Sequence, residues 1–148
     1  MGRGGEMPKF YAQHVGHQPE TSGFDMSAAR RSGANAWAKA RAVPEQLLTE
    51  PRQWATLDYR AVKDSSVDAQ IGWTVARSGT AHGFVAWFDT ILTEDVGFSN
   101  APDGEPLLYG NAFFPGKNRL PLPAATRLPF LCGPISLGIT IFGGGAVV

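Results

Sequence analysis

The feature that most constrains the fold is an apolar run from Ala81 to Leu92. In an extended chain alternate side chains point to opposite faces, and here both faces carry apolar residues: Phe84, Ala86 and Phe88 on one, Val85, Trp87 and Ile91 on the other. A strand that is apolar on both faces must be covered on both, which predicts a closed or sandwiched sheet. Asp89 interrupts the run. It fits either a carboxylate that accepts backbone N–H bonds at a strand end or a site residue.

The preceding stretch shows the two-residue period of a half-buried strand. Its alternation places Ala69, Ile71, Trp73 and Val75 on one face and Gln70, Gly72, Thr74 and Ala76 on the other. Eighteen Gly, 11 Pro and 11% aromatic residues favour turns and short strands over a helical bundle. The sequence therefore predicts a mainly β fold. We expect an antiparallel barrel or sandwich-like domain with a short helical N-terminal arm, incompletely closed at the C-terminus.

Composition narrows the class of protein. The chain has 148 residues, a length that suits one folded domain. Thirteen basic and 13 acidic residues balance to zero net charge, which gives no electrostatic case for binding nucleic acid. The single cysteine, Cys132, excludes an internal disulfide and a multi-cysteine zinc site. No apolar leader follows the first residues, so we expect a cytoplasmic protein without a signal peptide.

Changes in composition divide the chain into four parts. Residues 1–22 are predicted to be disordered or a remnant linker, 23–50 a helical arm, 51–127 the β-barrel domain and 128–148 an apolar tail. His14 and His17 are spaced like a metal pair on a helix, but no third ligand is near, so no metal site is predicted.

Local signals predict the individual elements. We expect a helix from Ser27 to Ala42, capped by Ser27 and divided by Gly33 into two short helices, and a helical turn from Pro44 to Leu48. Further strands and turns are expected at these positions: a first strand over Trp54–Val62, an edge over Phe98–Pro102, a turn at Asp103-Gly104, a strand over Leu107–Phe114, turns at Pro115-Gly116 and Lys117–Arg119, and a strand from Leu120.

Several segments, in order and at matching distances, resemble one family. HGFVAWFD at 82–89, FSNAP at 98–102 and LLYGNAFFP at 107–115 resemble the C-terminal β-barrel domain of protein arginine N-methyltransferases and their bacterial relatives. GFDMS at 23–27 resembles the segment that opens the family's dimerisation arm, and residues 47–51 and 57–59 resemble the stretch before the first barrel strands. The resemblance covers roughly residues 23–128. It implies a chain that can form a homodimer through this arm.

The resemblance also implies where a site would lie. Phe24, Met26 and Trp37 become dimer-arm candidates, although Trp37 fits packing within the domain equally well. The family's loop beside the active site falls on residues 107–109, which makes Tyr109 and Asn111 substrate-side candidates. Leu108 stands where the eukaryotic enzymes carry a histidine, so the methyl acceptor stays open between arginine and another group.

A complete methyl-transfer site is not expected in this sequence. The family enzyme uses S-adenosylmethionine, which needs a glycine-rich loop between a strand and a helix, and an acidic residue for the ribose. Gly143–Gly145 lacks a following helix, so we expect no cofactor to bind this chain and no residue of it to be catalytic. Glu45 and Glu50 lack the hairpin context of the family's guanidinium-binding glutamates. His82 fits a strand histidine better than a general base.

The last 21 residues, Leu128–Val148, carry no charge, yet two prolines and five glycines make them a poor membrane helix. A reading frame shifted from Ala124 can spell, with permitted codons, segments similar to the strands that follow in this family. We therefore hypothesise a frameshift near Ala124, which would leave residues 127–148 unselected for this fold. A makeshift strand over Ser136–Phe142 would then arise by accident.

Three functions remain open from the sequence. The first is a barrel-and-arm fragment of a methyltransferase, serving substrate-side and dimerisation roles and inactive without its cofactor domain, the missing partner. The second is a free-standing β-barrel binding module without catalytic activity. The third is an unrelated β-sandwich, which would not explain GFDMS at this offset. The first is favoured, with neither nucleic acid nor membrane as a partner.

Overall fold

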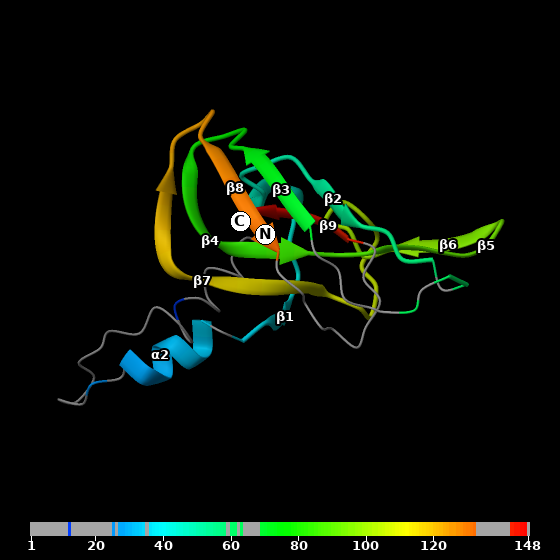
Figure 1. Cartoon of the computed structure of the whole chain (residues 1–148), viewed down its shortest axis with the longest axis horizontal. Helices are drawn as coiled ribbons and strands as arrows, with labels where there is room; N and C mark the ends of the chain where they lie inside the picture. Colours follow the sequence, from blue (N-terminus) through cyan, green and yellow to red (C-terminus); the bar gives the residue numbers. More distant parts are fainter. Residues whose placement is uncertain are drawn as a thin grey trace.

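The computed structural model describes residues 12, 25, 27–34, 36–58, 60–61, 63, 69–132 and 143–147. Strands dominate, and Figure 1 shows them curving around one body with a helix below it. The elements in chain order are α2 (Ser27–Ala34), β1 (Ala38–Ala40), the 3-10 turn η2 (Pro44–Gln46), β2 (Arg52–Ala55), β3 (Ala69–Thr74), β4 (Gly79–Ala86), β5 (Asp89–Thr93), β6 (Val96–Ser99), β7 (Asn111–Leu122), β8 (Arg127–Cys132) and β9 (Gly143–Val147). The prediction of a mainly β fold is confirmed.

All strand pairs are antiparallel, in one large and two small sheets. The large sheet has the order β1-β7-β4-β9-β2, while β3 pairs with β8 and β5 pairs with β6. None of these sheets, among the described strands, closes into a barrel, and the fold is sandwich-like. This agrees with the expected barrel or sandwich-like domain that is incompletely closed. Of the described helices, none has the length and apolar character that crossing a bilayer requires.

The central pair is β4 with β7, and β7 is longer than predicted. It runs unbroken from Asn111 to Leu122, so the turns expected at Pro115-Gly116 and Lys117–Arg119 are wrong. Pro115 lies opposite Gly83, beside a register shift between Ala81 and Gly83, where the ladder is irregular and a missing N–H is tolerated. Gly83 is needed there because a Cβ would lie 2.8 Å from the Phe113 ring.

Two buried clusters form the core. One contains Ala42, Val85, Trp87 and Phe113; the other contains Leu48, Val75, Ala81 and Leu122, with Leu128 packed against it. The apolar run of the sequence divides into β4 and β5 around Trp87, which is buried as expected. Phe84 and Phe88 are only half-buried. Full burial of one Val, Leu or Phe side chain contributes about 1.5–3 kcal/mol, so the two buried clusters supply much of the stability of the fold.

The arm differs from its prediction. The first helix ends at Ala34, beside the break expected at Gly33. In place of the second expected helix, Ala38–Ala40 forms β1 against β7, because pairing with a sheet edge overrides the helix propensity of alanine. Asp25, not Ser27, caps the helix: its carboxylate accepts the Ser27 N–H at 2.9 Å, which lowers the pKa of Asp25. The helical turn expected from Pro44 is confirmed, and this proline is its first residue.

Other boundaries also shift. The first strand expected over Trp54–Val62 is confined to β2, Arg52–Ala55, and the edge expected over Phe98–Pro102 is β6, Val96–Ser99. Residues 107–110 are loop rather than strand. The turn at Asp103-Gly104 is confirmed, because the Gly104 N–H donates to the Ala101 carbonyl at 3.0 Å.

The predicted tail contributes backbone to two sheets. Strand β8 pairs with β3, and β9 lies between β4 and β2. The turn before β8 contains Ala125 with a φ of 64°, in the left-handed region that favours glycine. The strand expected over Ser136–Phe142 lies outside the described residues.

Candidate functional site

The candidate site is the loop from Asn100 to Gly110, between β6 and β7. It has no regular secondary structure beyond one tight turn, yet asparagines at both of its ends are buried: Asn100 is 6% exposed and Asn111, the first residue of β7, is 4% exposed. Buried amides are costly unless they are hydrogen-bonded. Their partners therefore show how the loop is held.

Asn100 ties the loop to the end of β4. Its Oδ1 accepts the Phe88 N–H at 2.8 Å, and its Nδ2 donates to the Gly110 carbonyl at 2.7 Å. Its backbone N–H also donates to the Phe88 carbonyl at 3.2 Å. One side chain thus joins both ends of the loop to the residue that precedes β5.

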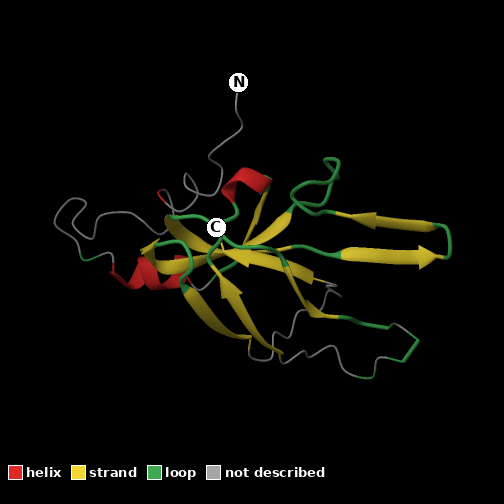
Figure 2. Cartoon of the chain, turned by 90° about the horizontal axis from the view of Figure 1, so that it is seen from above, coloured by secondary structure: helices red, strands yellow, loops and turns green. Residues whose placement is uncertain are grey.

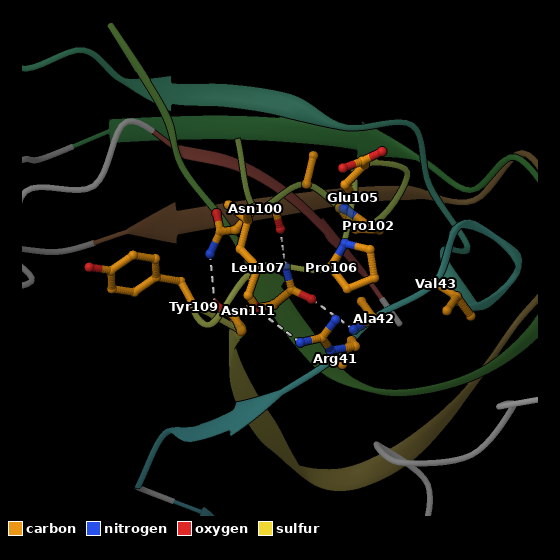
Figure 3. Close-up of a pocket in the computed structure, with 13 residues that line it drawn as sticks. Arg41, Ala42, Val43, Asn100, Pro102, Glu105, Pro106, Leu107, Tyr109 and Asn111 are labelled. Carbon is orange, nitrogen blue, oxygen red and sulfur yellow. Dashed lines mark hydrogen bonds between the residues drawn. The ribbon is translucent and has the colours of Figure 1, made fainter. Parts of the chain in front are cut away.

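Asn111 ties the same loop to the arm. Its Oδ1 accepts the buried Ala42 N–H at 2.7 Å, and its Nδ2 donates to the Asn100 carbonyl at 2.6 Å. Figure 3 shows Asn111 between Asn100 and Ala42, with these bonds drawn as dashed lines. The two amides form one connected network, in which removal of either leaves buried partners unsatisfied.

Two cations of the arm hold the outer part of the loop. Lys39 Nζ donates to the Leu108 carbonyl at 2.7 Å, and an Arg41 guanidinium nitrogen donates to the Leu107 carbonyl at 2.8 Å. The approach requires a glycine at 110, because a Cβ there would lie 2.5 Å from the Ala40 carbonyl oxygen. The end of the arm and the loop are therefore in direct contact along residues 39–42 and 107–111.

The loop presents two large apolar side chains to solvent. Tyr109 is 58% exposed and Leu108 is 85% exposed. The Tyr109 ring stacks on Phe98, with centroids 6.0 Å apart, and meets Phe88 edge-on at 6.0 Å. Phe88 and Phe98 are themselves in edge contact at 5.6 Å. The exposed ring is thus held in one orientation by two half-buried neighbours.

Two cavities border the loop and share its asparagines and Tyr109. The first, of about 210 Å³, has Arg41 and Glu105 among its lining residues (Figure 3). The second, of about 250 Å³, is mainly apolar and has Trp37, Phe88 and Phe114 among its walls, with Lys39 beside them. This geometry can bind and orient a flat or apolar group. Among the described lining residues no histidine, cysteine or serine offers a nucleophile.

The structure brings three of the five predicted site residues together. Trp37, Tyr109 and Asn111 line the second cavity, so the arm candidate and the substrate-side candidates share one space. Trp37 is 52% exposed, and the amide of Asn111 is already engaged within the chain. Phe24 and Met26 lie outside the described residues. The roles assigned to all five stay predictions.

Sequence reasoning missed the residues that hold the site. Asn100, Lys39 and Arg41 were not singled out, although Asn100 belongs to the FSNAP segment. The available signal was the pair of asparagines that flanks a proline-rich and glycine-rich loop. Asn and Asp often bond to backbone groups at such loop ends.

Among the described residues, Gly143–Gly145 does not fit the glycine-rich loop that would hold S-adenosylmethionine, because it lies inside β9 and pairs with β2 and β4 instead of opening a helix. His82 lines neither cavity; burial, and then the charge of Arg119, lowers its pKa. Nowhere in the described part of the chain do three His, Cys, Asp or Glu side chains gather as a metal site would require.

Comparison with known families supports the interpretation of these motifs. The family model described as the arginine methyltransferase oligomerization subdomain matches residues 7–107. A search of curated proteins found no match. The matched range includes the arm, β4, the hairpin of β5 and β6, and residues 100–107 of the loop, whereas Tyr109 and Asn111 lie beyond it. The chain therefore belongs to the arginine methyltransferase family and carries its oligomerization subdomain.

Proposed function

We propose that this chain is the self-associating, substrate-side part of an S-adenosylmethionine-dependent methyltransferase. The arm would form a homodimer, and the loop carrying Tyr109 would form a wall for the methyl acceptor. One observation carries the proposal: the bond from the Ala42 N–H to Asn111 joins the end of the arm to the end of the loop. An element that dimerises and an element that faces the substrate are thereby held in one arrangement.

The proposal assigns no chemical step to this chain. S-adenosylmethionine and the reacting groups would belong to a methyltransferase domain that acts with it, in the cytoplasm, where a lone reduced cysteine is ordinary. Titration calorimetry of the chain with S-adenosylmethionine should give no saturable binding. Tight binding would contradict this division of labour. The methyl acceptor stays open, because Leu108 stands at the position of the family's histidine.

Self-association is the most direct test. We expect sedimentation velocity of the purified chain to show a discrete dimer, which Trp37→Ser weakens because it removes the large exposed side chain of the arm. Leu120→Ser is the matched control, because Leu120 is exposed to the same 52% but lies on β7. A chain that stays monomeric at every concentration would contradict the proposal.

The proposed frameshift near Ala124 belongs to the same account. Its support is the left-handed backbone of Ala125, because the shifted frame can supply a glycine in this turn. The shifted-frame version should then unfold at a higher temperature and stay more soluble than the chain as given.

A free-standing binding module is the second candidate. The pairing of β8 and β9 with other strands favours it, because both strands of the tail then take part in this chain's own sheets. A sharp, cooperative melt of the chain as given, at the higher temperature of the two versions, would favour the module over the fragment.

A further inference from the structure

The second cavity lies on the face of the large sheet opposite the buried cluster of Val85 and Phe113. Because side chains alternate along a strand, the neighbours of these two residues, Ala86 and Ala112, point to the other face. The two alanines lie opposite each other on β4 and β7, and both line the cavity. Side chains this small leave space above the strands, so the sheet itself forms the floor of the cavity.

Aromatic side chains form the walls of this cavity. Phe114 stands on β7, Phe88 and Tyr109 stand at the ends of the loop, and Trp37 precedes β1. The Tyr109 ring is held by its edge contact with Phe88 and its stacking on Phe98. Rings placed around a small space bind a flat ring well, because the faces and edges of aromatic rings attract each other.

The size of the cavity suits a small flat molecule. Its volume is about 250 Å³, just below the roughly 300–1,000 Å³ that is common for sites of drug-sized ligands. One substituted ring is therefore a better match than a larger ligand.

The charge around the cavity is of one sign. Among the described lining residues the only charged side chain is Lys39, which lies opposite Ala112 on β1. Its Nζ donates to the Leu108 carbonyl at 2.7 Å, and its stem lies so close to Gly110 that a Cβ added there would be 3.0 Å from Lys39 Cγ. An ammonium carries three N–H donors, so Lys39 can also donate to an anion in the cavity.

The neighbouring acidic side chains lie outside the cavity. Asp89, Glu94 and Asp95 belong to the hairpin of β5 and β6 and its turn, and none of them is a lining residue. The hairpin projects from the body, as Figure 1 and Figure 2 both show. A cationic ligand would meet Lys39 without a carboxylate to offset the repulsion, whereas an anionic ligand would be attracted. The same reasoning disfavours a guanidinium in this cavity.

We propose that the second cavity binds a planar aromatic carboxylate, with its ring between the aromatic walls and its carboxylate on Lys39. The ring lies over Ala86 and Ala112, and Lys39, in the same row across the strands, donates to the carboxylate oxygens. This inference rests on the proposed function, in which Tyr109 forms a wall for the methyl acceptor, and it names the class of molecule that this wall receives.

Titration of the full chain with three matched ligands tests the charge preference. The probes are benzoate, its neutral amide benzamide and the cation benzylammonium, which share one ring. NMR measures such weak binding from the shifts of backbone amides, which should change at Lys39, Gly110 and Ala112. We expect benzoate to bind about fivefold more tightly than benzamide, since an ion pair at an exposed lysine is a modest contribution, and benzylammonium to bind most weakly.

Lys39→Met tests the carboxylate contact, because methionine keeps an unbranched side chain and removes the charge. In this variant benzoate should bind no more tightly than benzamide, while benzamide, which needs only the walls, should bind as before. Lys117→Met is the matched control, since it removes another exposed lysine, on β7 and outside the cavity, and should leave both affinities unchanged.

Several results would overturn the inference: equal affinity for the three probes, tightest binding of benzylammonium, amide shifts outside the cavity, or a preference for benzoate that survives Lys39→Met. If Lys39→Met binds neither benzoate nor benzamide, Lys39→Arg decides, because it keeps the charge: recovered benzoate binding supports the inference and its absence overturns it. Sedimentation of the same chain reports self-association separately. A monomer that binds benzoate in the cavity would contradict the proposed dimer and leave the ligand class standing, and a dimer that binds no probe would do the reverse.

Discussion

The loop of residues 100–110 and the hairpin of β5 and β6 are neighbours in the chain, but they are held in opposite ways. The hairpin has a backbone ladder, with one register shift between Ile91 and Thr93, yet most of its side chains are exposed. The loop has no ladder, yet buried amides fix both of its ends, and arm cations hold its outer part. Regular secondary structure is therefore a poor guide to which segment is anchored.

The difference matches the role proposed for the loop. A wall for the methyl acceptor needs a fixed position, which the connected bonds of Asn100 and Asn111 provide. The described residues of the hairpin line neither cavity, and most of them are exposed. Each prediction below that concerns these two segments alters one of them and leaves the other unchanged.

The largest effect should come from removing an anchoring amide. Asn100→Ala leaves the Phe88 N–H and the Gly110 carbonyl without their partners, so we expect unfolding free energy to fall by about 2–3 kcal/mol in urea titrations. Asn118→Ala removes an exposed asparagine of β7 and should change it by less than about 0.5 kcal/mol. Equal effects of the two substitutions would mean that the loop is not anchored through Asn100.

A smaller loss should follow from crowding the contact between arm and loop. Gly110→Ala would place a Cβ 2.5 Å from the Ala40 carbonyl oxygen, so the strand must shift, at a cost of about 1–2 kcal/mol. Gly72→Ala is the matched control, because nothing lies within 4 Å of its added Cβ. Thermal unfolding of both variants gives the comparison. A Gly110→Ala chain as stable as Gly72→Ala would refute the close contact.

Low pH should destabilise the folded chain through His82, which lies on β4. His82 has a folded-state pKa below its ordinary value of 6.5, chiefly because burial disfavours its charged form, so the unfolded chain binds the proton more readily. The loss of folding stability caused by protonation of His82 is absent well above pH 6.5 and grows as the pH falls below 6.5. We expect a modest fall in melting temperature between pH 7.5 and pH 5.5, reduced in His82→Gln. An unchanged pH dependence in that variant would assign the effect to other groups.

The smallest effect on folding should come from the hairpin. Ile91→Ser with Leu92→Ser changes two side chains that are 84% and 64% exposed, so unfolding free energy should change by less than about 0.5 kcal/mol. Urea titrations measure this change. A large loss of stability would show that these residues serve the fold.

The sequence predicted the elements that depend on local pattern. The alternation over residues 69–76 corresponds to β3, Pro44 begins a helical turn, and Asp103-Gly104 lies in a turn, because period and turn chemistry are local properties. The mainly β class followed from the apolar run at 81–92.

Long-range pairing decided what the sequence could not predict. The alanines at 38–40 are good helix formers, but they form an edge strand because β7 offers unpaired groups there. Pro115 suggests a strand end by itself, and only the irregular ladder opposite Gly83 allows β7 to continue. Asn100 and Asn111 are 11 residues apart in sequence, so their mutual bond depends on the loop conformation that they stabilise.

Hydrogen exchange at the Ala42 amide tests the central claim, that Asn111 ties the arm to the loop, most directly. This N–H is buried and donates to Asn111 Oδ1 at 2.7 Å. In the unmodified chain it should be protected, and in Asn111→Ala its protection should fall far more than that of the β3 amides, which pair with β8. If the Ala42 amide keeps its protection in Asn111→Ala, or loses it only in step with the β3 amides, the side chain is not the tie between arm and loop.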